Sequence, residues 1–338
     1  MKSATLNAAL FGVLAILAFL SLSVGPVTLP PGEIVLSLLP PWPDAAAPLD
    51  EAARARVIVI HIRLPRVALA VLVGASLGMS GAALQGLLRN PLADPGLIGV
   101  SASASLGAVL CIYFGGSALS VWATPLAGMA CAALATLVLW RVMRGGAGDL
   151  TLMLAGIALS SLAAALTSLS LNLAPNPSDA EDIMLWLLGS VSDRSFDDLR
   201  LCLPFVLIGF VLLFSSGLGL EALTVGEDEA RSLGVDLSRL RITVIAGAAS
   251  CVGASVAVTG AIGFVGLVVP HMLRRFVGFH PARLLVSSAL GGAALLLAAD
   301  LALRLFSGNR ELMLGVVTAL IGAPFFLALV LREKRMAA

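Results

Sequence analysis

Residues 64–88 read LPRVALAVLVGASLGMSGAALQGLL, and this stretch decides what kind of fold the chain can adopt. After Arg66 it continues for 22 residues without a charge. A helix of about 20 apolar residues spans the hydrocarbon core of a bilayer, whereas a helix on a soluble protein would carry a polar face. The stretch therefore predicts a transmembrane helix.

The rest of the chain shares this character. Of its 338 residues, 59% are hydrophobic and 12% are charged, and the mean hydropathy is +1.02. Soluble domains average about 45–50% apolar and about 25% charged residues. Because so few charges cannot cover a protein in water, we predict an all-α polytopic membrane protein with one transmembrane domain over 1–338. About ten transmembrane helices are expected, at 6–24, 64–88, 97–115, 121–143, 150–173, 200–220, 241–260, 262–277, 283–304 and 312–331.

Basic residues predict how these helices are oriented. With both termini in the cytoplasm, 13 of the 21 Lys and Arg residues lie inside and eight lie outside, which agrees with the positive-inside rule. The first apolar run follows Lys2, as in a signal peptide, but residues 21–26 lack a clear small-x-small cleavage site. We therefore expect this run to remain as a helix.

The two halves of the chain show a weak internal similarity. The apolar runs 64–88 and 241–260 are each followed by a segment broken by Gly and Pro, at 90–96 and 263–270. The first of these runs is expected to point inward and the second outward. This arrangement allows two inverted halves, about 1–199 and 200–338, an architecture typical of transport proteins.

The inventory of reactive residues argues against an enzyme. The two lysines, Lys2 and Lys334, lie at the termini, so the chain lacks the Gly-Lys-Ser/Thr of a P-loop. The histidines His61, His271 and His280 have no ligand neighbours at helical spacing, and the four cysteines lie in apolar runs. We expect no metal, cofactor or catalytic group in this chain. Its net charge of +1 gives no sign of a nucleic-acid partner.

Small residues form a stripe along the predicted helix 64–88. Gly74, Gly78, Ala82 and Gly86 recur every four residues and so share one face. Small residues at this spacing let two helix backbones approach closely in a membrane. The alternative is a face that lines a pathway or gate, because the same helix leads directly into Asn90 and its following proline.

Arginines collect on the predicted outer side, which topology rules disfavour. Arg63 and Arg66 begin the helix 64–88, and Arg304 ends another helix four residues after Asp300. The residues themselves allow two interpretations. The arginines reach toward lipid headgroups, with Asp300 and Arg304 paired on one helix face, or they receive carboxylates from a docking partner.

Several long motifs resemble the FecCD family, the permeases of type II ABC importers for ferric siderophores, haem and cobalamin. They are RLPR at 63–66, GAALQG at 81–86, NPLADPGLIGVS at 90–101, GFVGLVVPH at 263–271 and GVVTALIGAPFF at 315–326. The resemblance covers nearly the whole chain in order. Only the start of the last helix departs visibly, with Glu-Leu-Met where the family usually has Glu-Leu-Pro.

The resemblance implies a cobalamin-permease-like bundle in the bacterial inner membrane, working as a homodimer with its pathway on the two-fold axis. Two separate ATPase subunits would hold ATP and Mg, and a periplasmic substrate-binding protein would dock on Arg63, Arg66 and Arg304. Asn90 and Leu92 match the motif that lines the cytoplasmic gate. The loop that couples to the ATPase would contain Glu227, Ala230, Arg231, Leu233, Gly234 and Arg239.

The expected function is therefore import of an iron chelate, haem or a ferric siderophore, by alternating access. Cobalamin is the alternative cargo, since relatives carry all three. A secondary transporter driven by an ion gradient is a further alternative, but it needs charged residues inside the membrane. The predicted helices have almost none. A membrane-embedded enzyme would need a catalytic constellation, and the sequence offers none.

Overall fold

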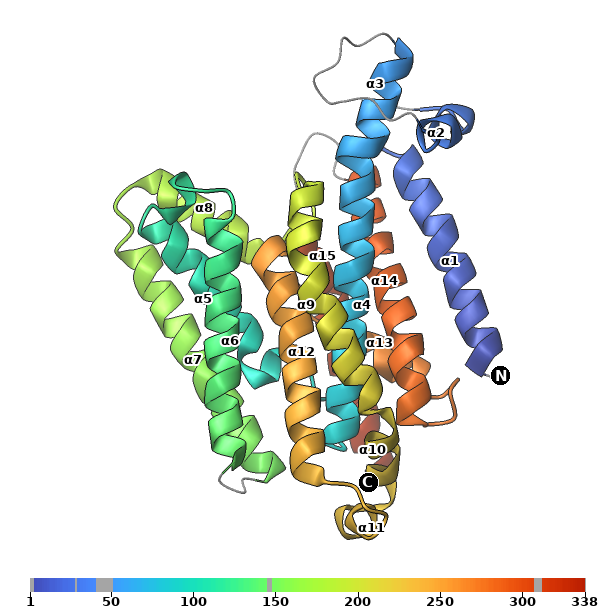
Figure 1. The fold of residues 1–338 in the computed structure, drawn as a ribbon, viewed down its shortest axis with the longest axis vertical. Helices are drawn as coiled ribbons and strands as arrows, with labels where there is room; N and C mark the ends of the chain where they lie inside the picture. Colours follow the sequence, from blue (N-terminus) through green and yellow to red (C-terminus); the bar gives the residue numbers. More distant parts are fainter. Residues whose placement is uncertain (1–2, 28, 41–50, 145–147, 307–311, 338) are drawn as a thin grey trace.

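The computed structural model of the chain describes residues 3–27, 29–40, 51–144, 148–306 and 312–337. Within these ranges every regular element is helical, and the helices run up and down a single bundle (Figure 1). The all-α prediction is thereby confirmed for the described residues.

Seven helices are long and apolar enough to cross a membrane. The second of them extends a preceding short helix, so that its apolar stretch covers Arg54–Leu87 without interruption. The seven are α1 (Ser3–Ser23), α4 (Leu64–Leu87), α6 (Ala123–Arg144), α7 (Asp149–Asn172), α9 (Phe196–Ser215), α12 (Leu237–Thr259) and α14 (Pro281–Phe306).

Three further helices fall on the remaining predicted spans. They are α5 (Val100–Tyr113), α13 (Val265–Leu273) and α15 (Leu314–Ala337). The nine residues of α13 rise only about 14 Å at 1.5 Å per residue, about half the thickness of a hydrocarbon core. Each of the ten predicted runs thus contains a helix, but length and composition support seven crossings, and the count of ten stays a prediction.

Short elements gather at the two ends of the bundle (Figure 1). One end carries α2 (Pro31–Ser37), α3 (Glu51–Val57) and α8 (Pro177–Leu188), and the other carries α10 (Gly217–Ala222) and α11 (Glu227–Ser232). Both chain ends lie toward the α10 and α11 end. We call this the inner end and the opposite one the outer end, following the predicted orientation.

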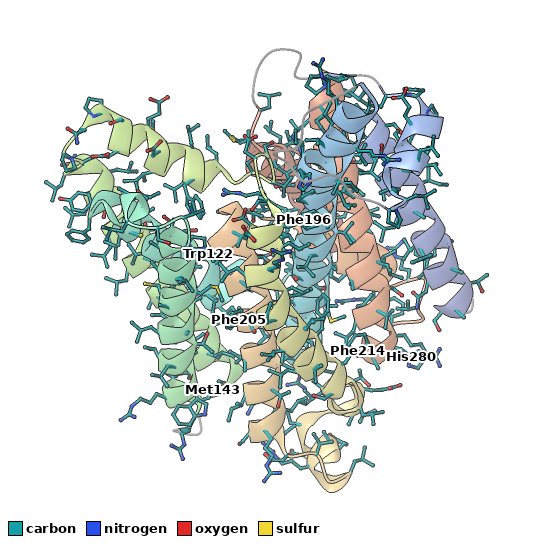
Figure 2. All side chains as sticks on the ribbon, turned by 45° about the horizontal axis from the view of Figure 1, so that its top comes forward. Trp122, Met143, Phe196, Phe205, Phe214 and His280 are labelled. Atoms are coloured by element: carbon teal, nitrogen blue, oxygen red, sulfur yellow. The ribbon has the colours of Figure 1, made fainter. Side chains whose placement is uncertain are left out.

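Burial divides the long helices into two groups. In the apolar windows of α4, α12 and α14, 78%, 78% and 72% of the residues are buried, against 22–28% in α1, α6, α7 and α9. The first group forms the core, and the second leaves large apolar side chains uncovered, such as Phe205 and Phe214 on α9 (Figure 2). An apolar exterior around an apolar core is the pattern expected of a protein dissolved in lipid.

The small-residue stripe of α4 lies against α14. A Cβ atom at Gly78 would overlap the carbonyl oxygen of Ser288, and one at Gly74 would overlap that of Gly292. Gly292 in turn has no room for a Cβ beside the carbonyl of Gly74. Backbone therefore touches backbone here, as the packing alternative predicts. Of the other two stripe residues, Ala82 is buried. A Cβ added at Gly86 would lie at ordinary contact distance from the side chains of Leu220 and Pro281.

Candidate functional site

At the outer end, one buried carboxylate holds two arginines. Asp300 on α14 accepts hydrogen bonds from Arg66 at the start of α4, with Nε at 3.0 Å and Nη2 at 2.7 Å from Oδ1. Arg304, one turn later on α14, places Nη2 2.8 Å from Oδ2. Both carboxylate oxygens are thus engaged, and the cluster keeps an excess of positive charge.

The sequence accounts for this cluster physically. A carboxylate buried inside an apolar helix is stable only when it is paired, and the i,i+4 spacing puts Arg304 on the same face as Asp300. Arg66 and Asp300 are 234 residues apart in the sequence. They meet because the close contact at the glycines brings α4 against α14. The pairing of Asp300 with Arg304 belongs to one of the two interpretations that the sequence allowed, and the bidentate partner Arg66 to neither.

The third predicted docking residue, Arg63, points to a different helix. Its guanidinium donates to the carbonyls of Leu22 and Ser23, at 2.5 and 3.0 Å, and to that of Val27. The last carbonyls of α1 have no partners within their own helix, so a cation there satisfies them and the helix dipole. Arg304 also donates a hydrogen bond to this end of α1, to the carbonyl of Ser21 at 2.8 Å.

These contacts decide how much of each arginine a partner could reach. Arg63 is buried, and the side chain of Arg304 is nearly so. The Arg66 side chain keeps 22% of its surface exposed. The structure thus brings the three predicted docking residues to one end of the bundle and gives each an internal partner. Whether a second protein docks on them stays a prediction.

A π-helical turn precedes α4 at Ile58–Arg63. The amide of Leu64 donates to the carbonyl of Val59, five residues back, rather than four. Pro65 follows directly, and its ring would clash with a carbonyl in a regular α-helical turn. The widened turn accommodates the proline and divides the arginines, with Arg63 facing α1 and Arg66 facing α14. The apolar sequence of this segment gave no signal for it.

A cavity of about 1040 Å³ opens beside the cluster. Its lining includes Arg66 and Arg304, together with Trp186 of α8 and Arg194 of the loop that follows α8. The Arg194 guanidinium lies 5.0 Å from the Trp186 ring centre, and burial lowers the pKa of Arg194, with Asp198 opposing the effect. Arg194 was not among the site residues predicted from the sequence.

The cavity wall carries hydrogen-bond donors without acceptors. Among the described residues, Nε of Arg194, Nε of Arg304 and Nε1 of Trp186 are buried and have no hydrogen-bond partner. Buried polar groups normally find partners, so unsatisfied donors in one place call for an explanation. All three atoms are covered by their surroundings, so a carboxylate in the cavity could accept from them only after these side chains turn toward it.

At the inner end, Glu227, Ala230 and Arg231 of the predicted ATPase coupling loop lie on α11, Leu233 and Gly234 follow it, and Arg239 lies at the start of α12. Ala230 is fully buried against the bundle, whereas Leu233 at the end of the helix is 70% exposed. Gly234 follows with φ of +86°, a conformation that favours glycine. Arg239 pairs with Asp236 at 3.2 Å on the surface. The element is thus anchored on one side and presents an apolar residue on the other.

The predicted gate residues form tight turns between α4 and α5. Oδ1 of Asn90 accepts from the amide of Leu92 at 2.9 Å, and Oδ1 of Asp94 accepts from that of Gly96 at 2.8 Å. Such Asx turns fix an irregular backbone without help from a helix or sheet. The structure therefore explains why these residues shape the loop. Their role as a gate is a prediction that geometry alone does not test.

One buried amide, missed by sequence reasoning, connects this region to α13. Nε2 of Gln85 donates to the carbonyl of Leu267 at 3.3 Å, and its Oε1 accepts from Arg274 at 2.5 Å. Gln85 lies in an otherwise apolar stretch of α4. A buried amide in an apolar helix needs hydrogen-bond partners from a neighbouring helix. The presence of Gln85 in this stretch could therefore have predicted such a contact.

Comparisons with known proteins decide the family. The model of the FecCD transport family matches residues 13–332. The chain belongs to the FecCD transport family. This FecCD chain is 41% identical over 307 residues to a cobalamin import system permease protein of Halobacterium salinarum, covering 88% of this chain and 81% of the relative. It is 38% identical over 281 residues to a hemin transport system permease protein of Yersinia pestis, with coverage of 82% and 84%.

The fold comparison agrees with the family assignment. A solved structure described as an inward-facing conformation of a proposed metal-chelate type ABC transporter matches this FecCD chain with a TM-score of 0.85. The two are 32% identical, and the match covers 97% of this chain and 99% of the other. The resemblance inferred from the motifs is thereby confirmed. The chain is a multi-pass membrane protein and an ABC transporter permease of the FecCD type.

Proposed function

We propose that this chain is the membrane subunit of an ATP-driven importer that moves an iron chelate, haem or a ferric siderophore, from periplasm to cytoplasm by alternating access. The observation that carries the proposal is its similarity, over more than four fifths of its length, to permeases named for hemin and cobalamin. Cobalamin is the alternative cargo. ATP and Mg belong to two partner ATPase subunits, and the membrane is the bacterial inner membrane.

Uptake by a reconstituted complex tests the cargo. The permease, its cognate ATPase and its binding protein are placed in proteoliposomes, and uptake of haemin, ferrichrome and cyanocobalamin is compared with ATP inside or absent. We expect ATP-dependent uptake of haemin or ferrichrome. Uptake of cyanocobalamin alone would transfer the proposal to the alternative cargo, and ATP-independent uptake of any of the three would contradict it.

An ion-coupled secondary transporter is less well supported. Such a protein needs an acid inside the membrane that can release its partner and bind an ion. Among the described residues the acid buried within a long helix is Asp300, and it is held by both Arg66 and Arg304. Two cations on one carboxylate leave little affinity for a third.

Docking of the binding protein is proposed for the outer cavity, where cations exceed acids in the Asp300 cluster and donors lack acceptors. Acidic side chains of the partner would supply the missing oxygens.

The substitution Arg66→Gln tests this site. It keeps a hydrogen-bond donor for Asp300 but removes the charge from the most exposed arginine of the three. We expect the affinity for the binding protein to fall about 30-fold, the ~2 kcal/mol at the lower end of the range for breaking an interfacial charge pair. Surface plasmon resonance with the cognate binding protein measures it. Arg200→Gln, on an exposed arginine of the same end, should bind as the wild type does, and equal affinities for all three proteins would remove Arg66 from the site.

The ATPase is proposed to bind at α11, whose exposed Leu233 offers an apolar contact. The substitution Leu233→Pro would remove the hydrogen bond from the Leu233 amide to Glu229, now 3.0 Å long, and disrupt the last turn. We expect the complex to hydrolyse ATP while uptake falls to the level without ATP. Uptake that still tracks hydrolysis would contradict the placement of the coupling element.

Two copies of the chain are proposed to pair, with the pathway between them. The supporting observation is the low burial of α7 and α15, which leave Leu154, Leu162, Leu320 and Leu327 more than half exposed. Lipid can cover such faces, but a homodimer places part of them against a second copy.

A further inference from the structure

One carboxylate at the inner end gathers three arginines. Oε1 of Glu227 accepts from Nη2 of Arg241 at 3.0 Å and from Nη2 of Arg89 at 3.5 Å. Oε2 accepts from Nη2 of Arg231 at 3.3 Å. Other acids lie at the inner end, yet these three arginines share the carboxylate of Glu227.

The three arginines come from three different parts of the fold. Arg231 lies on α11 with Glu227 itself, Arg241 lies in the first turns of α12, and Arg89 follows the end of α4. Arg89 also directly precedes Asn90, so it opens the loop 89–98 that holds the predicted gate. Glu227 therefore connects α11 to a core helix and to this loop.

The backbone at Arg89 provides a second, independent observation. Its φ is +48°, in the left-handed region that residues with a Cβ rarely adopt. The amide of Asn90 bonds to the carbonyl of Gln85 and that of Arg89 to Gly86, the pattern of a Schellman motif at a helix end. Glycine is the usual residue at this position because it adopts the conformation without strain. An arginine at this position is unfavourable for the turn itself. Its presence is therefore explained by the contact of its side chain with Glu227.

We propose that Glu227 is a positioning residue that transmits displacement of α11 to the loop 89–98 through Arg89 and to α12 through Arg241. The inference rests on the proposed importer function and deepens it. When the ATPase moves α11, the carboxylate moves with it, and three like-charged groups lose or regain their shared counter-ion. The loop and α12 follow the carboxylate because separation would leave the arginines facing one another unneutralised.

The members of the network differ in how far water reaches them. The side chains of Glu227, Arg89 and Arg241 are 26%, 48% and 17% exposed. The pair of Glu227 with Arg89 is the most exposed one of the network apart from that with Arg231, and exposed ion pairs contribute little to folding. A variant at Arg89 should therefore fold, which makes the transmitting role of the network open to measurement.

The decisive experiment follows the loop directly and needs no knowledge of the cargo. Hydrogen exchange of residues 89–98 is measured in the complete permease–ATPase complex, without nucleotide and trapped with ATP and vanadate. ATP hydrolysis is recorded on the same samples, and uptake of the probe cargo found active above is recorded in proteoliposomes. We expect trapping to change exchange in the wild-type loop. In Glu227→Gln that change should disappear while hydrolysis continues, and uptake per ATP should fall about tenfold, within the range for residues coupled in one network.

Asp228→Asn is the matched control. Asp228 neighbours Glu227 on the same short helix, is almost fully exposed and pairs with Arg231 at 2.6 Å. It touches neither α12 nor the loop 89–98 through any ion pair of the described residues. This variant should keep both the exchange change and the ratio of uptake to hydrolysis.

Arg89→Gly separates transmission from stability. Glycine suits the backbone at this position, so the melting temperature should stay the same or rise. The nucleotide-dependent change in hydrogen exchange and the uptake per ATP should nevertheless fall as in Glu227→Gln. If Glu227→Gln fails to assemble, Arg89→Gly tests the proposal without it. Normal loop response and coupling in Arg89→Gly would overturn the proposal, as would a wild-type loop that ignores nucleotide. A loop that responds in a complex without uptake would instead count against the importer function.

Discussion

Replacing Gly78 with valine is expected to prevent the bundle from forming its core. A Cβ at this position overlaps the carbonyl oxygen of Ser288, and backbone atoms of α14 cannot move aside as a flexible side chain can. Two of the three core helices, α4 and α14, would have to separate along their length. Overpacking of cores typically costs about 1–3 kcal/mol and occasionally more, and a contact between two rigid backbones belongs among the cases that cost more.

Size-exclusion chromatography and thermal unfolding in detergent measure this effect. Gly12→Val is the matched control, because Gly12 also lies in an apolar helix, α1, and nothing lies within 4 Å of where its Cβ would be. We expect the control to elute and unfold like the wild type, whereas Gly78→Val should aggregate or unfold at a much lower temperature. Equal behaviour of the two variants would mean that α4 and α14 do not pack as described.

Replacing Asp300 with alanine is expected to have the second largest effect. The substitution leaves the guanidinium groups of Arg66 and Arg304 without their carboxylate in a largely buried place. Breaking a buried ion pair from one side costs about 3–5 kcal/mol. Arg304 also holds the end of α1, so we expect the loss to loosen that helix as well.

Thermal unfolding measures the loss, and Asp197→Ala provides the comparison, since Asp197 forms an exposed pair with Arg200. A further variant combines Asp300→Leu with Arg66→Met and Arg304→Met. Replacing a whole buried ion cluster with apolar residues is often neutral or stabilising, so this triple variant should recover the stability lost at the cluster, though not the contact of Arg304 with the end of α1, and still fail to bind the binding protein. A triple variant that binds normally would assign the cluster to structure alone.

The sequence predicts the elements of this fold well because lipid imposes a simple rule. A helix that crosses a bilayer must be long and apolar, so each of the ten predicted runs contains a helix. Chemistry alone also pairs Asp300 with Arg304, since four residues along a helix bring two side chains together. The rule gives less guidance for α13, which is apolar throughout but has only nine residues.

Contacts between distant segments could not be predicted in the same way. The partner of Arg66 is 234 residues away, and those of Arg63 are carbonyl groups, which every residue has. The π-helical turn before Pro65 and the left-handed Arg89 depend on backbone geometry that apolar periodicity does not encode. The arginines could therefore be recognised as unusual, but not the partners that hold them.

We propose that this chain forms the transport pathway but does not hydrolyse ATP itself, and one transport measurement tests this most directly. Purified permease is reconstituted alone, with the binding protein, and with both the binding protein and the ATPase, each with ATP inside the vesicles. We expect the probe cargo to accumulate only in vesicles that hold the permease, the binding protein and the ATPase. Accumulation by the permease alone, driven by an ion gradient or by ATP, would contradict it.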